Sequence, residues 1–360
     1  MAKSQTLLDL IDRFTPELKK AFLAAIQDIK DSARLGQIEA AIRAGSMQSA
    51  IDAIGIDKAA FRPLTAAMEQ AFETGGVFTA SNFTRQAGQA AFRFDVRNSR
   101  AEAWLRDQSS TLVQGIQDEQ LELVRSVLNK GMNTGVNPKT LASNIVGKVG
   151  PNGREGGILG LNSKQLEYRD NAIDELRNMH RGPYTDPVTG RRVDPLAQYK
   201  NRELRDKRFD SLVEKAERTG TPLSSDDISR LGTRYEDGLL KWRGETIARD
   251  QSITALNQSQ NEAANQLIES GAADPQDVTR EWDSAGDSRT RESHKEMDGQ
   301  QRRVNEPFKA PSGALMMYPG DTSLNAPASE TINCRCVVKL TVDYIGRAKR
   351  LSAVPPTNLS

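Results

Sequence analysis

The stretch from Glu281 to Leu340 reads EWDSAGDSRTRESHKEMDGQQRRVNEPFKAPSGALMMYPGDTSLNAPASETINCRCVVKL. It contains both cysteines of the chain, Cys334 and Cys336, and one of the two histidines, His294. Prolines and glycines recur along it, which predicts short elements joined by loops and disfavours long helices. The stretch therefore predicts a small α+β domain near the C-terminus.

Local patterns within and just before this stretch predict short strands and one helix. The period-2 side of a first strand carries Val278, Arg280 and Trp282, so only its ends are apolar. The remaining expected elements are a helix from Arg289 to Met297 capped by Asp287 or Ser288 and ended by Gly299, and strands at Gln300–Val304, Leu315–Tyr318 and Ile332–Leu340.

In the last of these strands, Cys334 and Cys336 are two residues apart, so both side chains point to one side. A mutual disulfide is disfavoured, because two residues of strand separate the Cα atoms by about 6.6 Å, near the upper edge of disulfide geometry. Two thiols and His294 are ligands that Zn²⁺ takes, with Asp298, Asp321 or water as the fourth. C-x-C is not one of the common zinc spacings, so two buried core cysteines beside a hydrogen-bonded histidine remain the alternative.

The same part of the chain carries an ordered series of motifs, W, D-x-R-x-R-x-x-H, D-G, P-F, Y-P-G-D and N-C-R-C. This order resembles the C-terminal domain of phage minor head proteins, the head morphogenesis family typified by the F protein of phage Mu. The resemblance covers roughly the last third of the chain. One departure is Asp250-Gln251, which stand where the family helix has Thr-Glu, so Glu245 or Asp250 is the candidate substitute for that glutamate.

The resemblance implies a structural minor head (capsid) protein of a tailed bacteriophage, associated with the portal and with head assembly. Its implied partners are the phage portal protein and the major capsid protein. The implied location is the virion, in the head interior or near the portal, and the host cytoplasm during assembly. Delivery into the cell with double-stranded DNA is a further implied option.

Arginine and acidic residues in the C-terminal stretch predict a salt-bridged brace, because arginine can hold a carboxylate through two parallel hydrogen bonds. The expected members are Trp282, Asp287, Arg289, Arg291, His294, Asp298, Asn333 and Arg335. H-E-x-x-H is absent, and no nucleophile has an evident activating base. We therefore expect no catalytic activity, with a metal-dependent enzyme carried in the head as an alternative.

Composition limits the remaining possibilities. The 360 residues include 49 Lys plus Arg and 48 Asp plus Glu, which gives a net charge of +1. This charge does not favour electrostatic binding of nucleic acid by the chain as a whole. Aromatic residues make up 5% and mean hydropathy is −0.59, which suits long helices that bury apolar surface on a partner. Two cysteines form no disulfide framework, and no apolar run has the length of a membrane span.

The chain upstream predicts a mainly α-helical body. We expect an N-terminal helical region over residues 1–97, a long-helix body over 98–271, the compact α+β domain over 272–345 and an extended or disordered tail over 346–360. The expected boundaries include a helix start at Thr15-Pro16-Glu17, a helix end at Gly75-Gly76 and a long helix from Asp237 to Ser270. A docking platform for a multisubunit partner and a plain helical bundle are both compatible with the first region.

Residues 181–199, RGPYTDPVTGRRVDPLAQY, predict a tight turn or small hairpin that projects from the helical body. Arg191 and Arg192 lie at its expected tip, and a basic helix is expected over 200–208, with Lys207 and Arg208 near its end. These four cations are candidates to contact DNA phosphate, which gives a DNA-contacting ejection protein as the second alternative function. A solvated basic face is the simpler interpretation.

Overall fold

The computed structural model describes residues 6–88, 92–151 and 153–353, and most of these residues are helical. Contacts divide the chain into two units, one of Met1–Ala21, Pro63–Thr111 and Glu245–Ser360, the other of Phe22–Arg62 and Leu112–Gly244. Helices α1 (Leu7–Ser32), α5 (Ser99–Asn133) and α10 (Ser225–Glu269) each contribute residues to both units. A mainly helical body with a small α+β region near the C-terminus is thus confirmed.

Helix α1 begins earlier than Thr15-Pro16 predicted, and Pro16 lies inside it. Proline removes one helical hydrogen-bond donor, and the Thr15 hydroxyl donates to the Ile11 carbonyl at 2.8 Å in the same turn. The apolar residues Leu18, Phe22 and Ile26 form a buried stripe at helical spacing, and Leu10 and Phe14 extend it upstream. Burial of this longer stripe favours one helix that continues through the proline.

Helix α4 (Arg62–Ala87) passes through Gly75 and Gly76, so the helix end predicted there is wrong. A Cβ atom at Gly75 would lie 2.2 Å from Ser259 Oγ and 2.8 Å from Leu256 Cδ2, both on α10. The glycine therefore allows α4 to approach α10 closely, and this packing maintains the helix across residues that usually interrupt one.

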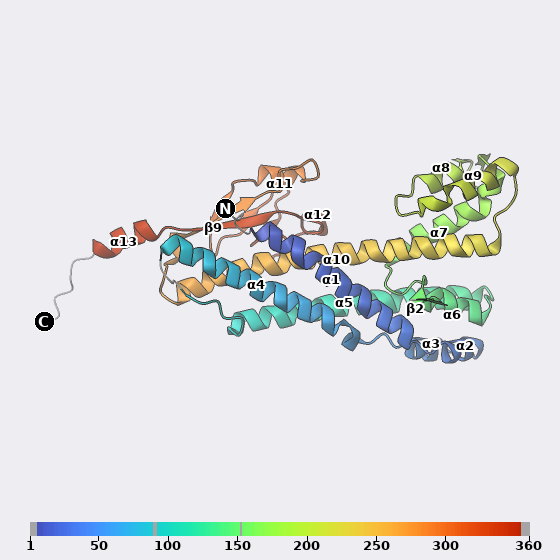
Figure 1. Ribbon diagram of the computed structural model, residues 1–360, viewed down its shortest axis with the longest axis horizontal. Coiled ribbons are helices and arrows are strands. Elements are labelled where there is room, and N and C mark those ends of the chain that lie inside the picture. The colour runs from blue at the N-terminus through green and yellow to red at the C-terminus, as the bar shows by residue number, and fades with distance from the viewer. Residues whose placement is uncertain (1–5, 89–91, 152, 354–360) are drawn as a thin grey trace. The chain divides into compact units, whose positions relative to one another are not determined.

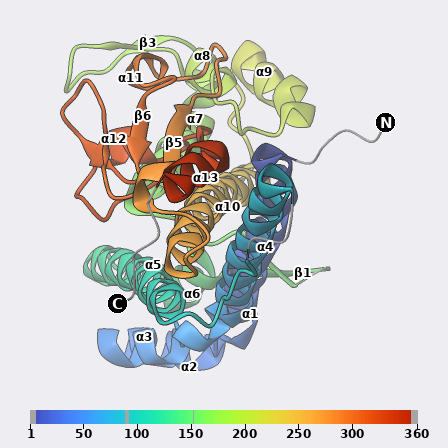
Figure 2. The same ribbon diagram turned by 90° about the vertical axis from the view of Figure 1, so that its left-hand side faces the viewer.

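The unit formed by Phe22–Arg62 and Leu112–Gly244 contains most of the short helices. Its elements are α2 (Leu35–Arg43), α3 (Met47–Ile54), η1 (Lys58–Phe61), α6 (Pro138–Val146), β1 (Lys148–Gly150), β2 (Gly153–Glu155), α7 (Ser163–Asn178), η2 (Met179–Arg181), β3 (Tyr184–Thr185), β4 (Arg192–Val193), α8 (Pro195–Lys200), η3 (Lys207–Phe209) and α9 (Asp210–Thr219). Helices α7, α8 and α9 share a buried cluster with the first turns of α10, which includes Met179, Tyr199 and Leu231. Figure 2 shows α7, α8 and α9 beside one another.

The hairpin predicted within residues 181–199 is present, because β3 and β4 pair antiparallel. Its connecting loop is exposed, with Val188 92% accessible. Backbone hydrogen bonds from Thr189 and Val188 lower the pKa of the Asp186 carboxyl and hold the turn. The basic helix expected over residues 200–208 does not form, since α8 ends at Lys200 and the short η3 follows a turn.

The C-terminal elements form two small sheets with two short helices, gathered beside the C-terminal half of α10 (Figure 1). Strand β5 (Val278–Asp283) lies between β6 (Gln301–Arg303) and β9 (Val337–Val342), antiparallel to both. The other elements are η4 (Pro275–Asp277), α11 (Glu292–Glu296), β7 (Phe308–Lys309) paired with β8 (Leu315–Met316), and α12 (Ala328–Thr331). Their shared core contains Trp282, Phe308, Met316 and both cysteines.

Several predicted boundaries differ from the structure here. Helix α11 is shorter than expected, because the Asp287 carboxylate accepts the Arg289 N–H at 2.9 Å and makes a turn before it. Strand β9 begins only after Cys336, because Asn333 adopts a left-handed φ of 55° and bends the preceding chain. The long helix α10 starts twelve residues before Asp237, at Ser225, where Ser224 caps it by accepting the Asp227 N–H at 3.0 Å.

The tail predicted to be extended is helical in its described part. Helix α13 (Tyr344–Ser352) is capped by Asp343, which accepts the Gly346 N–H at 2.8 Å. Arg350 pairs with the buried carboxylate of Asp277, so charge as well as capping favours the helix. The prolines of the expected tail, within residues 354–360, lie outside the described residues. No described helix is both long and apolar enough to cross a membrane.

Candidate functional site

The C-terminal domain is attached to one face of α10 by four polar side chains, which we call the polar stripe. They are Asp250, Thr254, Asn257 and Asn261, whose spacing of four, three and four residues places them along one helical face. Asp250 accepts the Asn333 N–H at 2.6 Å, Thr254 donates to the Gly320 carbonyl at 3.2 Å, Asn257 accepts the Val338 N–H at 3.1 Å and Asn261 accepts from Arg280 at 3.3 Å.

Two contacts of the polar stripe, those of Thr254 and Asn257, satisfy backbone groups that the domain would otherwise bury without a partner. Asn257 is fully buried, and its amide also donates to the Ile253 carbonyl at 2.9 Å. Gly320, at a φ of 86°, comes so close that a Cβ atom there would lie 2.8 Å from Thr254 Oγ1. The sequence shows that Asn and Gln crowd one side of this helix, but three of the four partners lie 66 to 83 residues away and the fourth, Arg280, lies 19 residues away.

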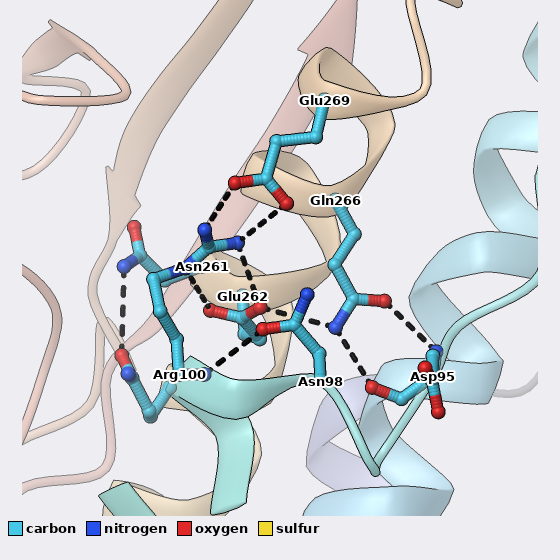
Figure 3. A network of polar contacts seen from close by, with 8 residues as sticks. Asp95, Asn98, Arg100, Asn261, Glu262, Gln266 and Glu269 are labelled. Carbon is cyan, nitrogen blue, oxygen red and sulfur yellow. Dashed lines mark hydrogen bonds and ion pairs between the residues drawn. The ribbon is translucent and has the colours of Figure 1, made fainter. Parts of the chain in front are cut away.

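A second polar network joins the end of α10 to the start of α5 and the segment before it (Figure 3). Arg100 binds Glu262 at 3.0 Å and also pairs with Glu269, and these hydrogen bonds raise the pKa of its guanidinium. Gln266 accepts the Asp95 N–H at 2.8 Å and donates to the Asp95 carbonyl at 2.9 Å. The helix that carries the polar stripe is therefore fixed at its own C-terminal end.

Arg280, on β5, is the buried cation of the domain, with 1% of its surface exposed. Its guanidinium donates to the Arg303 carbonyl at 3.2 and 2.9 Å and to the carbonyls of Met317 and Glu306, and lies 5.2 Å from the Phe308 ring centroid. Burial lowers its pKa to about 10. Arg280 was not among the predicted brace residues, although its place on the side of β5 that carries Val278 and Trp282 was the available signal.

The predicted brace residues fall into several contacts. Arg335 pairs with Asp287 through two guanidinium nitrogens and holds the pKa of that carboxyl well below its usual range. Arg291 donates to the Ile332 carbonyl, and Asp298 accepts the Ser284 N–H at 2.8 Å. The side chain of Arg289 is exposed, and its contact with Asp287 is made by its backbone N–H.

The structure brings His294, Cys334 and Cys336 together in the domain core. The imidazole Nδ1 lies 3.5 Å from the Cys334 sulfur and 3.4 Å from the Cys336 sulfur. All three residues are 1% exposed, and the Trp282 ring meets the imidazole edge-on with 5.2 Å between centroids. The mutual hydrogen bond of the cysteines raises the pKa of Cys334, as burial does, and lowers the pKa of Cys336.

The opposite nitrogen of His294, Nε2, lies 3.1 Å from Glu330 Oε2, within ion-pair distance but outside hydrogen-bond geometry. Glu330 also accepts from Ser293 at 2.9 Å and from Ser312 at 2.7 Å. Burial raises the pKa of Glu330, but the two serine hydroxyls and the charge of His294 together outweigh it and lower that pKa. The imidazole is thus oriented with Nδ1 toward the sulfurs.

Neither carboxylate considered as a fourth ligand joins this cluster. Asp321 accepts the N–H groups of Met317 at 2.7 Å and Ser323 at 2.8 Å, and Asp298 is exposed. Among the described residues, the His, Cys, Asp and Glu side chains placed so that they could jointly hold a metal ion are His294, Cys334 and Cys336, whose ligand atoms lie within 4.8 Å of one another.

The candidate DNA contacts lie elsewhere in the chain. Arg191 and Arg192 are exposed in the β3–β4 hairpin, and Lys207 is exposed at the start of η3. Arg208 is also exposed, but its guanidinium is 2.6 Å from Asp206. Nearby Arg202 pairs with Glu175 at 2.6 Å and Arg205 with Asp210 at 2.9 Å, so acids neutralise much of the positive charge of this segment.

Residues 222–339 match the model of the family described as phage Mu protein F like protein. Over this region the chain is similar to the Mu F-like family. A search of curated proteins and a search of solved structures found no match. This similarity suggests a phage head morphogenesis protein.

The matched region begins just before α10 and ends inside β9. It therefore includes the polar stripe as well as the domain attached to it. The Mu F-like region thus begins upstream of the compact α+β domain that the sequence predicted over residues 272–345. In the family helix, Asp250 and Glu245 were the candidate substitutes for the usual glutamate. Asp250 contacts the domain through Asn333, whereas Glu245 pairs with Lys19 at 2.8 Å and Arg249 at 3.1 Å.

Proposed function

We propose that this protein is a structural minor component of a tailed-phage head, and that the Mu F-like region fastens it there. The supporting observation is the coincidence of the family match, residues 222–339, with the domain and the helix that holds it. The proposed partners are the portal protein and the major capsid protein, and the proposed location is the head near the portal.

The contacts explain how such a domain can transmit an attachment to the rest of the chain. Asp250 accepts a backbone N–H from Asn333, next to the two cysteines. Asn257 accepts a backbone N–H from Val338, on β9. Arg100 and Gln266 fix the last turns of the same helix. Because buried polar contacts are strongly directional, the domain is held in one orientation on α10.

A structural role also agrees with the buried position of the His–Cys cluster. A catalytic metal or nucleophile needs a position that substrate can reach. His294, Cys334 and Cys336 are each 1% exposed, and the polar side chain beside them, Glu330, is 5% exposed. These observations favour a bracing role over an enzyme carried in the head.

The proposal is tested by incorporation into heads assembled with the cognate portal and capsid proteins. We expect a chain that lacks residues 272–360 to be absent from purified heads, and Asn257→Ala to be incorporated less than wild type, because Val338 loses its partner. Asn265→Ala, a half-buried change on the same helix, is the matched control.

The truncation also exposes the face of α10 that the domain covers, so the Asn257→Ala protein is the cleaner variant. Circular dichroism of each purified chain shows whether the helices still form. Incorporation of the truncated chain at the wild-type level would refute an attachment role for the Mu F-like domain.

A further inference from the structure

We propose that His294, Cys334 and Cys336 form a structural zinc site that ties α11 to the segment leading into β9. The proposal concerns the folding of the domain and does not depend on where the protein is placed in a phage head. It combines an imidazole from one segment with two thiols from another, 40 and 42 residues further along the chain.

The distances fit a tetrahedral zinc ion. With ordinary Zn–S and Zn–N bond lengths, a tetrahedral ion places a bound nitrogen and a bound sulfur about 3.6 Å apart. His294 Nδ1 lies 3.5 Å from the Cys334 sulfur and 3.4 Å from the Cys336 sulfur. The three ligand atoms all lie within 4.8 Å of one another, so little rearrangement is needed to bind one ion.

Glu330 supplies an independent argument. Metal-bound histidines usually place their second nitrogen against a carboxylate or carbonyl, which fixes the ring and increases the basicity of the ligand nitrogen. Glu330 Oε2 lies 3.1 Å from His294 Nε2, and hydrogen bonds from Ser293 and Ser312 hold that carboxylate. A carboxylate therefore lies within ion-pair distance of the second nitrogen, where the outer partner of a metal-bound histidine is expected, although the pair lacks hydrogen-bond geometry in this structure.

Charge and burial select the metal and its role. Two thiolates and a neutral imidazole are soft ligands that suit zinc and disfavour magnesium or calcium. Their charges and that of Zn²⁺ sum to zero, which lowers the cost of placing them where each residue is 1% exposed. Asp298 and Asp321 are engaged elsewhere, so water is the expected fourth ligand.

The domain has a structural need for such a link. Its strands have two to six residues and α11 has five, so local hydrogen bonding stabilises each element weakly. A bound metal adds its binding free energy to folding, because the ligands are not assembled in the unfolded chain. The zinc ion would join α11 to the bend at Asn333, where the chain has a left-handed φ of 55°.

The test is elemental analysis of the purified full-length protein produced in zinc-supplemented cells. We expect stoichiometric zinc in the wild type and substoichiometric zinc in His294→Ala and Cys336→Ser. Met297→Leu changes a fully buried core side chain without removing a ligand, and this control should retain the metal. Removal of zinc by a chelator should lower the melting temperature of the wild type and leave the His294→Ala protein unaffected.

Cobalt substitution keeps the proposal testable if the ligand variants do not fold. Wild-type protein titrated with Co²⁺ should develop thiolate-to-cobalt charge-transfer absorption and the intense visible bands of a tetrahedral ion. Glu330→Gln should retain this spectrum but bind the ion about 10- to 100-fold more weakly, as expected for loss of an outer-shell partner. Wild-type protein without zinc and without a cobalt–thiolate spectrum would overturn the proposal, whatever the outcome for head incorporation.

Discussion

The C-terminal domain and the segment from Arg181 to Arg208 are both rich in arginine and in loops, yet they use their charges differently. Arg280 is 1% exposed and donates to backbone carbonyls that lie 23 to 37 residues further along the chain. The side chain of Arg208 is 76% exposed and pairs with Asp206, two residues away. Arginine therefore organises the interior of one region, whereas acidic neighbours neutralise it in the other.

The largest effect is expected where the buried charge is removed. Arg280→Met leaves the carbonyls of Arg303, Met317 and Glu306 without their donor, so we expect a loss of about 3–4 kcal/mol in the free energy of unfolding. Denaturant titration followed by tryptophan fluorescence measures it, because Trp282 lies in the same core.

Arg303→Met is the matched control, since Arg303 is exposed on the adjacent strand and its side chain binds Gln276 and Thr279. We expect this change to cost less than about 1 kcal/mol. Equal losses in the free energy of unfolding for the two variants would show that the buried position of Arg280 does not increase its contribution to stability. The proposed contrast between the two regions would then be wrong.

Local sequence signals predicted much of the helical body. Ser46, Asn137 and Asn162 cap α3, α6 and α7 through their side chains, and Pro138 follows Asn137 at the first helical position. Such signals act within one turn of helix, so they can be found in a single sequence. The predictions at Pro16 and Gly75 were wrong because tertiary packing outweighed the local preference for a boundary.

The candidate site was predictable only in part, for a related reason. Cys334, Cys336 and His294 are rare in this chain, so their convergence could be predicted from the sequence. The polar stripe could not, because Asn257 binds a backbone group 81 residues away and nothing beside it in sequence identifies that partner. The role of Arg280 likewise depends on the end of β6, the turn after it and the segment after β8, which bring their carbonyls to it.

Two aspartates provide an intermediate test of the contrast. Burial raises the pKa of Asp250 from 3.8 to about 6, against the opposing effects of the Asn333 N–H and the charges of Arg291 and Arg249. A carboxyl whose pKa is raised on folding contributes stability that is complete below its unfolded pKa and is lost as pH rises through its folded pKa. Wild type should therefore lose stability between pH about 4 and about 7 relative to Asp250→Asn, by about 1–2 kcal/mol after allowance for partial exposure.

Asp186 in the hairpin should behave in the opposite sense. Hydrogen bonds from the Thr189 and Val188 N–H groups lower the pKa of the Asp186 carboxyl. The contribution of this carboxyl to folding stability is therefore present above its unfolded pKa and is lost as pH falls through its folded pKa. Thermal melts of Asp250→Asn and Asp186→Asn at several pH values should thus diverge from wild type in opposite directions. Parallel pH profiles would contradict the assignment of burial to one aspartate and turn hydrogen bonding to the other.

The smallest effect is expected at the exposed cations. Replacing Arg191, Arg192, Lys207 and Arg208 with serine should change the free energy of unfolding by less than about 0.5 kcal/mol, because all four side chains lie at the surface. Each cation that contacts DNA phosphate adds about 0.9 to the slope of log affinity against log salt for duplex DNA. Arg208 should contribute least, since Asp206 already neutralises it. Fluorescence anisotropy with labelled duplex at several salt concentrations measures that slope, and an identical slope in wild type and variant would exclude the hairpin region as a DNA contact.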